Sequence, residues 1–458
     1  MTRSLLAAGA AAALMLTGSA CGLGSTGTGS EGSVSRVPEL APDQEVSIVF
    51  ESYNFGQAGA WTDTFNELIA AFEKEHPNIT VTAQKPQGNS ANPATDTISS
   101  LQSQLTAGSP PDVVQLGFSD LDFTINELKA LPLDDLVGRD AVQANFDGAR
   151  HPYAPSARTL GDWEGKTYGV PFVFSTPMLY VNKKLFTEAG LDPEQPPTTW
   201  AEVRDAAQAI DRRTGKDGVY VDCLTKTAKD WCFQALVRSH GGTVISDDRT
   251  RLTFAEKPSI DVVRFMRDMV REGIMPNRTQ TQAVESFARG DLGMILESSA
   301  IQGMFLQGAG DAWELGAAAM PSFEGKQAVP TNSGAALFVF AQDPAKQRAA
   351  WELIKFLTSE RAYTTIATKI GYLPLRTGLV EDPGGLESWA ADNPYLAPNL
   401  AQLEHLEPWV SMPGPSYLQI RDGMMQAVEN AVFQGAGPAE ALRSAQQEAS
   451  ALLPGGER

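Results

Sequence analysis

The sequence predicts an α/β protein with two lobes, and three observations support this prediction. Strand-like apolar runs alternate along the chain with segments of helical periodicity, which is the pattern of an α/β fold with mainly parallel sheets. The chain has 458 residues, which is enough for two cores. Its 42 % hydrophobic and 20 % charged residues are ordinary for a globular protein, so most of the chain is expected to fold.

The first predicted elements follow one another from residue 46. Residues 46–50 form a strand-like run, and residues 61–72 carry apolar side chains at helical spacing until Pro77 ends the helix. Residues 79–81 and 111–116 are predicted to be further strands. The order strand, helix, strand is the repeating unit of an α/β sheet.

Two later helices are predicted from the residues at which they begin. Thr199 and Glu202 have the spacing of a capping box, in which each side chain accepts a hydrogen bond from the backbone of the other. Asp343 followed by Pro344 combines a helix cap with a proline in the first turn. Both patterns predict helices over the apolar segments that follow them.

The amino terminus has the features of a bacterial lipoprotein precursor. A basic residue precedes twelve apolar or small residues at 5–16, which form the core of a signal peptide and are too short to span a bilayer. The small residues before Cys21 are similar to a lipobox, although Gly18 stands where a leucine is usual. We therefore expect a signal peptide at 1–20 and a lipidated Cys21 at the start of a flexible tether, residues 21–43. The alternative is an ordinary secretory peptide with an incidental cysteine.

Charge and cysteine content restrict the partners and the compartment. Lys and Arg number 36 against 55 Asp and Glu, and the resulting net charge of −19 disfavours a nucleic-acid partner. With Cys21 assigned to lipid, Cys223 and Cys232 remain, and an even pair outside the cytoplasm predicts a disulfide. The four histidines are scattered singly, so we expect no metal site and no cofactor.

The sequence contains no complete motif for enzymatic chemistry. Residues 161–167 resemble a phosphate-binding P-loop, but three residues instead of four separate the glycines. A hairpin-like turn that leads into a strand is the simpler interpretation. The G-x-S-x-G, H-E-x-x-H and EF-hand patterns do not occur, and we expect no enzyme. A glycosidase stays possible, because no spacing in a sequence shows whether two carboxylates face each other across a sugar ring.

Two longer stretches carry a resemblance to a known family. Residues 171–183 (PFVFSTPMLYVNK) and 189–200 (AGLDPEQPPTTW) resemble the extracellular solute-binding proteins of ABC importers. Within that family they look most like the binders of glycerol 3-phosphate and glycerophosphodiesters. Shorter matches follow in the order of the family, at residues 290–294, 298–299, 333–334, 371–374 and 419–421.

The resemblance implies a type II periplasmic-binding-protein fold, in which three chain crossings join two α/β lobes and a ligand cleft lies between them. The crossings are expected near Ser175, near residues 332–335 and near residues 372–376. Ligands in open α/β sheets lie at strand ends, so these crossings would lie beside the cleft. The expected boundaries are 44–173 and 334–371 for lobe 1, and 178–330 and 376–454 for lobe 2.

The resemblance also implies a set of ligand contacts, carried over residue by residue from the phosphate-binding members. Hydroxyl groups and a backbone N–H can donate to phosphate oxygens, and an arginine can bind two of these oxygens at once. The matching residues are Ser175, Ser298 or Ser299, Gly334, Tyr372 and Arg421. Trp231 and Phe118 lie in matching regions and can stack on a ligand. For the glycerol end, the chain offers only the polar stretch 89–96, Gly117 and Phe118, with Asp120 as the nearest carboxylate.

Each of these residues also has a purely structural interpretation. The serines can be turn or cap residues, and Gly334 can be required by a tight backbone crossing. Arg421 can form a surface ion pair, and the aromatic residues can be packing residues.

The sequence therefore predicts a lipid-anchored binding protein outside the cytoplasm, monomeric and not an enzyme, that delivers a small polar solute to a membrane permease. The expected ligand is a glycerophosphodiester or glycerol 3-phosphate. One alternative keeps the family and replaces the ligand with a sugar or oligosaccharide, which could stack on Phe118, Phe174 or Trp231. A second alternative is a secreted glycosidase or phosphodiesterase built on another α/β fold.

Overall fold

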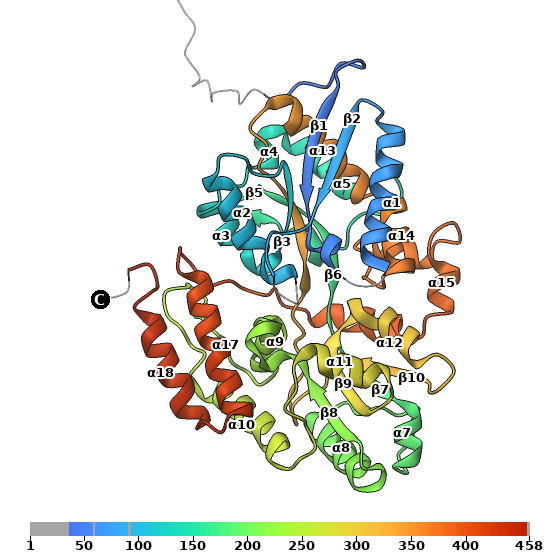
Figure 1. Ribbon diagram of the computed structural model, residues 1–458, viewed down its shortest axis with the longest axis vertical. Helices are drawn as coiled ribbons and strands as arrows, with labels where there is room; N and C mark the ends of the chain where they lie inside the picture. Colours follow the sequence, from blue (N-terminus) through green and yellow to red (C-terminus); the bar gives the residue numbers. More distant parts are fainter. Residues whose placement is uncertain (1–35, 58–59, 90–92, 456–458) are drawn as a thin grey trace, which may run out of the picture. The chain divides into compact units, whose positions relative to one another are not determined.

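The computed structural model describes residues 36–57, 60–89 and 93–455, and the predicted signal peptide and Cys21 lie outside these residues. Within them, the strands form a five-stranded sheet in lobe 1 and a four-stranded sheet in lobe 2 (Figure 1). The strand order is β2-β1-β3-β11-β6 in lobe 1 and β10-β7-β9-β8 in lobe 2. The two-lobed α/β fold that the sequence predicts is therefore confirmed.

The strands expected at residues 46–50, 79–81 and 111–116 are β1, β2 and β3. The strands of lobe 1 are β1 (Val46–Glu51), β2 (Ile79–Gln84), β3 (Val113–Gly117), β6 (Gly169–Ser175) and β11 (Ser333–Val339). The strands of lobe 2 are β7 (Pro177–Asn182), β8 (Asp217–Val221), β9 (Leu292–Ser298) and β10 (Leu315–Ala319). The P-loop-like segment forms the short hairpin of β4 (Asp162–Trp163) and β5 (Lys166–Thr167), which leads into β6 as expected.

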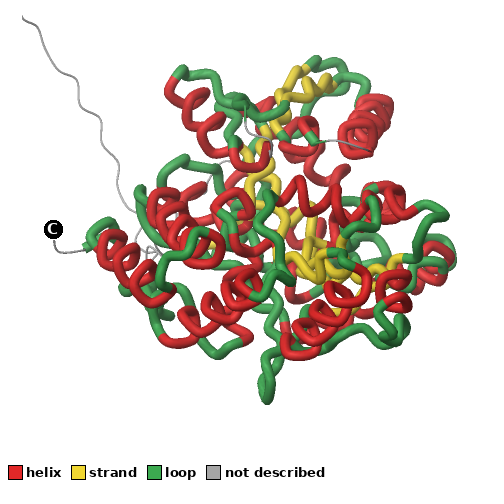
Figure 2. The backbone as a smooth tube through the Cα atoms, turned by 60° about the horizontal axis from the view of Figure 1, so that its bottom comes forward, coloured by secondary structure: helices red, strands yellow, loops and turns green. Residues whose placement is uncertain are grey.

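Helices surround the strands of both sheets (Figure 2). In lobe 1 they are α1 (Ala60–Glu75), α2 (Thr97–Thr106), α3 (Leu121–Asn126), α4 (Leu133–Leu136), α5 (Arg139–Asp147), α6 (Pro155–Arg158), α13 (Pro344–Leu357) and α14 (Glu360–Lys369). In lobe 2 they are α7 (Lys183–Glu188), α8 (Trp200–Thr214), α9 (Trp231–Ser239), α10 (Lys257–Arg271), α11 (Gln280–Ala288), α12 (Gln302–Ala309), α16 (Leu396–Ala401), α17 (Tyr417–Phe433) and α18 (Pro438–Ser450). No helix in the described part of the chain is both long and apolar enough to cross a membrane.

The helices α8 and α13 begin at the capping residues from which they are predicted. The Thr199 side chain accepts a hydrogen bond from the Glu202 backbone N–H, and Glu202 accepts one from the Thr199 N–H, so the capping box of α8 is formed. The Asp343 side chain caps α13 in front of Pro344. These side chains satisfy N–H groups that the first turn of a helix leaves without partners.

The prediction of mainly parallel sheets was wrong. β1 pairs with β2 and β3 in parallel, and β8 pairs with β9 in parallel. The strands through which the chain enters or leaves a lobe, β6, β7, β10 and β11, make antiparallel pairs. Each of these pairs contains β7 or β11, which reach their sheets from the other lobe rather than through a crossover helix, so the handed βαβ connection that makes neighbours parallel does not apply to them.

Within the described residues the chain passes between the lobes three times. The first passage is Thr176, the single residue between β6 and β7, and the second joins β10 to β11 and ends at Asn332. Both lie where the sequence places them.

The third passage lies further along the chain than expected. The Arg376 guanidinium donates to the backbone oxygens of Asn145 and His151 in lobe 1, at 2.6 and 2.8 Å. The chain is bonded to lobe 2 at Asn393, which accepts from Gln302 Nε2 of α12 at 3.1 Å, and at Tyr395, whose hydroxyl donates to the Leu315 oxygen of β10. Residues 376–386 therefore belong to lobe 1, and α15 (Glu387–Ala391) lies in the passage. A buried arginine whose donors are all directed at lobe 1 carbonyls fixes this segment there.

The expected tether, residues 21–43, also reaches too far along the chain. The Val37 backbone N–H donates to the Leu136 oxygen at 2.8 Å, and Glu39 forms an ion pair with Arg348. Val37 and Leu40 pack against the core of lobe 1. Residues 37–40 therefore belong to the fold rather than to a tether, because their apolar side chains have a surface to cover.

Candidate functional site

A cavity of about 160 Å³ is lined by residues of both lobes. Lobe 1 contributes residues from the ends of β3, β6 and β11, and lobe 2 contributes residues at the ends of β8 and β9. Five of the eight ligand contacts that the sequence predicts line it: Ser175, Trp231, Ser298, Gly334 and Tyr372.

The two lining serines meet at the first passage between the lobes. Ser175 is the last residue of β6 and Ser298 the last residue of β9, and the Ser298 hydroxyl donates to Ser175 Oγ at 2.8 Å. The Ser298 Oγ also accepts from the Ala300 backbone N–H, so this serine caps the short helix that follows β9. The hydroxyl of Ser175 remains available to donate toward the cavity.

Gly334 lines the cavity at a point where its backbone passes very close to the neighbouring strand β6. Its φ angle is +122°, and a Cβ atom at this position would lie 2.0 Å from the Val173 oxygen of β6. The close approach of the two strands is therefore sufficient to explain the glycine, and only its backbone can contact a ligand.

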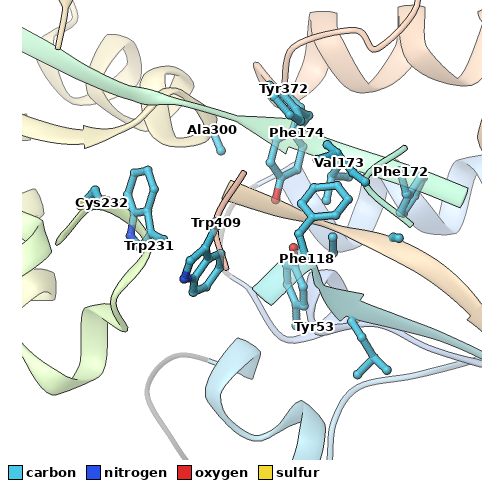
Figure 3. Packing of buried hydrophobic residues seen from close by; sticks show 14 of the residues in the cluster. Tyr53, Phe118, Phe172, Val173, Phe174, Trp231, Cys232, Ala300, Tyr372 and Trp409 are labelled. Atoms are coloured by element: carbon cyan, nitrogen blue, oxygen red, sulfur yellow. The ribbon is translucent and has the colours of Figure 1, made fainter. Parts of the chain in front are cut away.

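Aromatic residues of lobe 1 form one wall of the cavity. The Tyr372 ring packs edge-on against Trp61, with 4.9 Å between ring centroids. Tyr53 lines the same wall (Figure 3). Burial raises the pKa of Tyr53 to about 12, so its hydroxyl keeps its proton and can donate it.

Two tryptophans of lobe 2 lie near each other at the cavity (Figure 3). Trp409 Nε1 donates to Asp230 Oδ1 at 3.1 Å, which fixes this indole. Trp231 is the first residue of α9 and is followed by Cys232, which forms a disulfide with Cys223. The disulfide thus joins the segment of Trp231 to the segment after β8.

Two carboxyl groups lie at the lobe 2 end of the cavity. Asp222 directly follows β8 and Glu297 lies near the end of β9, and both are almost completely buried. Gln280 Nε2 donates to Asp222 Oδ2 at 3.0 Å and to Glu297 Oε1 at 2.8 Å. Burial, together with the neighbouring Glu297, raises the pKa of Asp222, and burial raises the pKa of Glu297.

Lys229 is the lysine that lines the cavity. Its Nζ donates to the Ala94 oxygen at 3.1 Å, so a side chain of lobe 2 reaches the backbone of lobe 1. Burial lowers the pKa of this ammonium group. A cation in this position can accept an anionic ligand without displacing an existing carboxylate partner.

Ser299 and Phe118 do not line the cavity. Ser299 Oγ accepts from the Thr176 backbone N–H at 3.3 Å, so it supports the first passage between the lobes. Phe118 is buried, and its ring lies 6.4 Å from that of Phe174. These contacts agree with the structural interpretations given above, a turn residue for Ser299 and a packing residue for Phe118.

Arg421 is buried and does not line the cavity. Its Nη2 donates to Asp422 Oδ1 at 2.9 Å, and its Nη1 donates to the Tyr417 hydroxyl at 3.3 Å and lies 4.0 Å from Asp120 Oδ1. The Tyr417 hydroxyl in turn donates to Asp120 Oδ1 at 2.7 Å. Asp120, the carboxylate expected near the glycerol end, is therefore a partner of this cluster instead.

Several cavity residues were not predicted as ligand contacts, among them Asp222, Glu297, Lys229 and Trp409. A signal for the two carboxyl groups exists in the sequence, because each follows an apolar strand run, in VYVD and MILE. Polar groups at the carboxyl ends of buried strands are typical of α/β ligand sites. No group of three or more metal-ligating side chains occurs among the described residues.

The fold and cavity can be compared with known proteins. A family model described as a bacterial extracellular solute-binding protein matches residues 67–396. The sn-glycerol-3-phosphate-binding periplasmic protein UgpB of Pectobacterium atrosepticum is 26 % identical over 326 residues, which cover 69 % of this chain and 71 % of that protein.

Two solved structures illustrate the range of ligands seen on this fold. UgpB from Mycobacterium tuberculosis in complex with glycerophosphocholine has a TM-score of 0.76 at 23 % identity, covering 89 % of this chain and 98 % of that one. Maltose-bound T. maritima MalE3 has a TM-score of 0.74 at 21 % identity, covering 89 % and 100 %. At these identities the likeness shows the fold and leaves the ligand to the chemistry of the cavity.

Proposed function

The chain belongs to the bacterial extracellular solute-binding proteins, and from this premise we propose that it is the substrate-binding component of an ABC importer whose ligand is a glycerophosphodiester or glycerol 3-phosphate. The protein binds the solute in the cleft between its lobes and delivers it to a membrane permease. It does so as a monomer held to the membrane by lipid on Cys21. Its role is binding and not catalysis.

The observation that carries the choice of ligand is the position of Lys229. This cation lines the cavity and hydrogen-bonds to a neutral backbone oxygen, whereas Arg421 is already surrounded by Asp120, Asp422 and Tyr417. A phosphate oxygen can replace the Ala94 oxygen as the partner of Lys229. The Ser175, Tyr53 and Tyr372 hydroxyls lie around the same space and supply further donors.

Calorimetry of wild type and Lys229→Gln tests this proposal with glycerol 3-phosphate, glycerophosphocholine and maltose. Removing the cation weakens binding of the phosphate compounds by about 10- to 100-fold, as expected for one partner of a desolvated charge pair, and changes maltose binding little. Lys226→Gln is the matched control, since Lys226 lies three residues earlier and is exposed. Binding of maltose alone by the wild type would reject the phosphate ligand.

A sugar is the second candidate ligand, favoured by one feature of the same cavity. Trp231 and Trp409 offer indole faces beside two carboxyl groups, and sugar rings are bound by stacking and by hydrogen bonds to carboxylates. In the calorimetric comparison this candidate predicts maltose binding that is insensitive to Lys229→Gln.

The lipid anchor has its own test. Cys21→Ala in the full precursor leaves the protein uncleaved or releases it from the membrane fraction, measured by fractionation and by the mass of the amino-terminal peptide. A processed variant that stays in the membrane fraction would contradict the anchor and leave the ligand proposal unaffected.

A further inference from the structure

The carboxyl groups of Asp222 and Glu297 are neighbours because of the register of two strands. β8 and β9 run in parallel with Val221 opposite Leu296, so the next residue of each strand brings Asp222 beside Glu297. Gln280 Nε2 donates to Asp222 Oδ2 at 3.0 Å and to Glu297 Oε1 at 2.8 Å, so one amide nitrogen bridges the two groups. Two buried carboxyl groups this close repel each other when both are ionised, which favours a pair that holds one proton.

The remaining partners of the pair leave its negative charge uncompensated. Gln280 donates one hydrogen bond to each group, and the Ser298 backbone N–H donates to Glu297. Among the described residues, none offers a hydrogen bond to Asp222 Oδ1. No lysine or arginine in the described ranges lies within ion-pair distance of either group.

The other ionisable groups around the pair do not supply that charge. Tyr220 of β8 and Tyr180 of β7 face the pair, and burial raises the pKa of both phenols, so they stay neutral. Glu429 of α17 adds negative charge near Tyr220. Lys229 lines the same cavity, but its hydrogen bond is directed at lobe 1.

The aromatic surroundings fit an organic cation. Trp231 and Trp409 line the same cavity, and indole faces attract ammonium groups through their quadrupole. A metal ion would need further ligands, and the described residues hold no group of three or more His, Cys, Asp or Glu side chains.

We propose that Asp222 and Glu297 form a subsite for the positively charged end of the ligand, an organic ammonium group, and that this group replaces the proton that the two carboxyl groups share. This inference rests on the proposed function and assigns each end of the proposed ligand to a part of the cavity. The phosphate lies toward Lys229 and the ammonium group toward the carboxyl pair. On binding, the protonated pair loses H⁺ to solvent and both carboxylates become ionised against the cation, so charge and atoms balance.

Proton counting by calorimetry tests the subsite. Binding enthalpies of glycerophosphocholine and glycerophosphoethanolamine are measured at one pH in two buffers of different ionisation enthalpy, with glycerol 3-phosphate as the ligand that lacks a cation. Binding of each cationic ligand is expected to release about one proton from the carboxyl pair, so its affinity should rise up to about 10-fold for each unit by which the pH is raised. Binding of glycerol 3-phosphate is expected to release none.

Variants supply a second measurement. Asp222→Asn and Glu297→Gln are expected to weaken the cationic diesters at least about 10-fold more than they weaken glycerol 3-phosphate. Glu285→Gln, which changes an exposed carboxylate on α11, is the control. Binding of the cationic diesters without proton release, at the affinity of glycerol 3-phosphate, overturns the subsite while the proposed function stands. Binding of maltose and of none of the phosphate compounds overturns both.

Discussion

At the scale of single residues, the proposed cation-binding pair, Asp222 and Glu297, is expected to lower the free energy of unfolding when it is ionised and has no ligand. Burial raises the pKa of both groups, so the native protein binds a proton more tightly than the unfolded chain does. The free energy of unfolding therefore falls as the pH rises above the ordinary carboxyl range near about 4, until the native pair loses its proton. Without ligand, the protein is expected to be less stable at pH 8 than at pH 5 on account of this pair.

Asp222→Asn is expected to reduce that loss, because the amide has no charge to bury and can donate to Glu297. Urea unfolding at pH 5 and pH 8 measures the effect as the difference between the two free energies of unfolding. The same difference in Glu285→Gln should equal that of the wild type. An unchanged or larger loss in Asp222→Asn would mean that the pair is not the group that titrates.

Gly334 is the second residue whose replacement has a defined outcome. Gly334→Ala adds a Cβ atom 2.0 Å from the Val173 oxygen at a φ of +122°. The backbone strain alone is expected to lower the free energy of unfolding by about 1–3 kcal/mol, and the clash with a strand backbone adds to this. Urea unfolding measures the loss.

Gly435→Ala separates strain from clash in that experiment. Gly435 also has a positive φ, of +83°, but nothing lies within 4 Å of the added Cβ. A smaller loss in Gly435→Ala is expected. Equal losses in the two variants would show that the contact with Val173 contributes nothing.

At the scale of elements, the disulfide holds two parts of the ligand site together. Cys223 follows Asp222, and Cys232 follows Trp231, so one covalent link connects the carboxyl pair at β8 with the indole at the start of α9. Loop closure over nine residues predicts that Cys223→Ser with Cys232→Ser lowers the free energy of unfolding by about 2–3 kcal/mol in the chain-entropy model.

The same double variant is expected to bind its ligand more weakly, since Asp222 and Trp231 are no longer fixed relative to each other. Calorimetry of the folded variant, compared with the wild type in non-reducing buffer, measures this change. An affinity equal to that of the wild type would show that packing alone positions the two residues.

The elements also show how far the sequence could predict this protein. β1, α1, β2 and the capped helices α8 and α13 were predictable, because alternation, periodicity and caps are properties of neighbouring residues. Of the residues that the resemblance implies as ligand contacts and that line the cavity, Ser175, Ser298 and Gly334 lie at strand ends, where the fold family places its cleft.

The rest depended on contacts between distant parts of the chain. Asp222 and Glu297 meet through the register of β8 and β9, and no local pattern gives a register. Arg421 fits a ligand-binding role by its type, and only the structure reveals that Asp120, three hundred residues earlier, is its partner.

At the scale of the whole molecule, contacts between the lobes outside the cavity hold the cleft together. Arg249 of lobe 2 donates to Asp122 Oδ2 of lobe 1 at 2.6 Å, and its guanidinium lies 5.4 Å from the centre of the Trp163 ring. If the lobes move as rigid bodies about the three passages, this pair forms only when the cleft is closed. Ligand binding should therefore reduce the radius of gyration measured by solution scattering.

Arg249→Ala is expected to shift the lobes toward the open arrangement. The lost hydrogen bond to a charged group contributes about 1.5–3 kcal/mol to closure, so the ligand affinity should fall about 10- to 100-fold. Arg251→Ala, which removes an exposed arginine two residues away, is the control. A radius of gyration that does not respond to ligand in the wild type would contradict the hinge, and unchanged affinity in Arg249→Ala would contradict the role of this pair.

The described chain enters the fold through lobe 1, where Val37 and Glu39 are fixed, and leaves it through lobe 2, where α18 packs on α17 and α10. Because one end is held in lobe 1 and the other in lobe 2, a stretching force applied between them acts across the interface between the lobes. Work done against the ligand then adds to work done against the fold, so in an optical trap the first rupture event should occur at a higher force when the cleft is occupied. Ligand binding is thus expected to raise the mechanical resistance of the protein, and the force at first rupture should show for each single molecule whether its cleft is occupied.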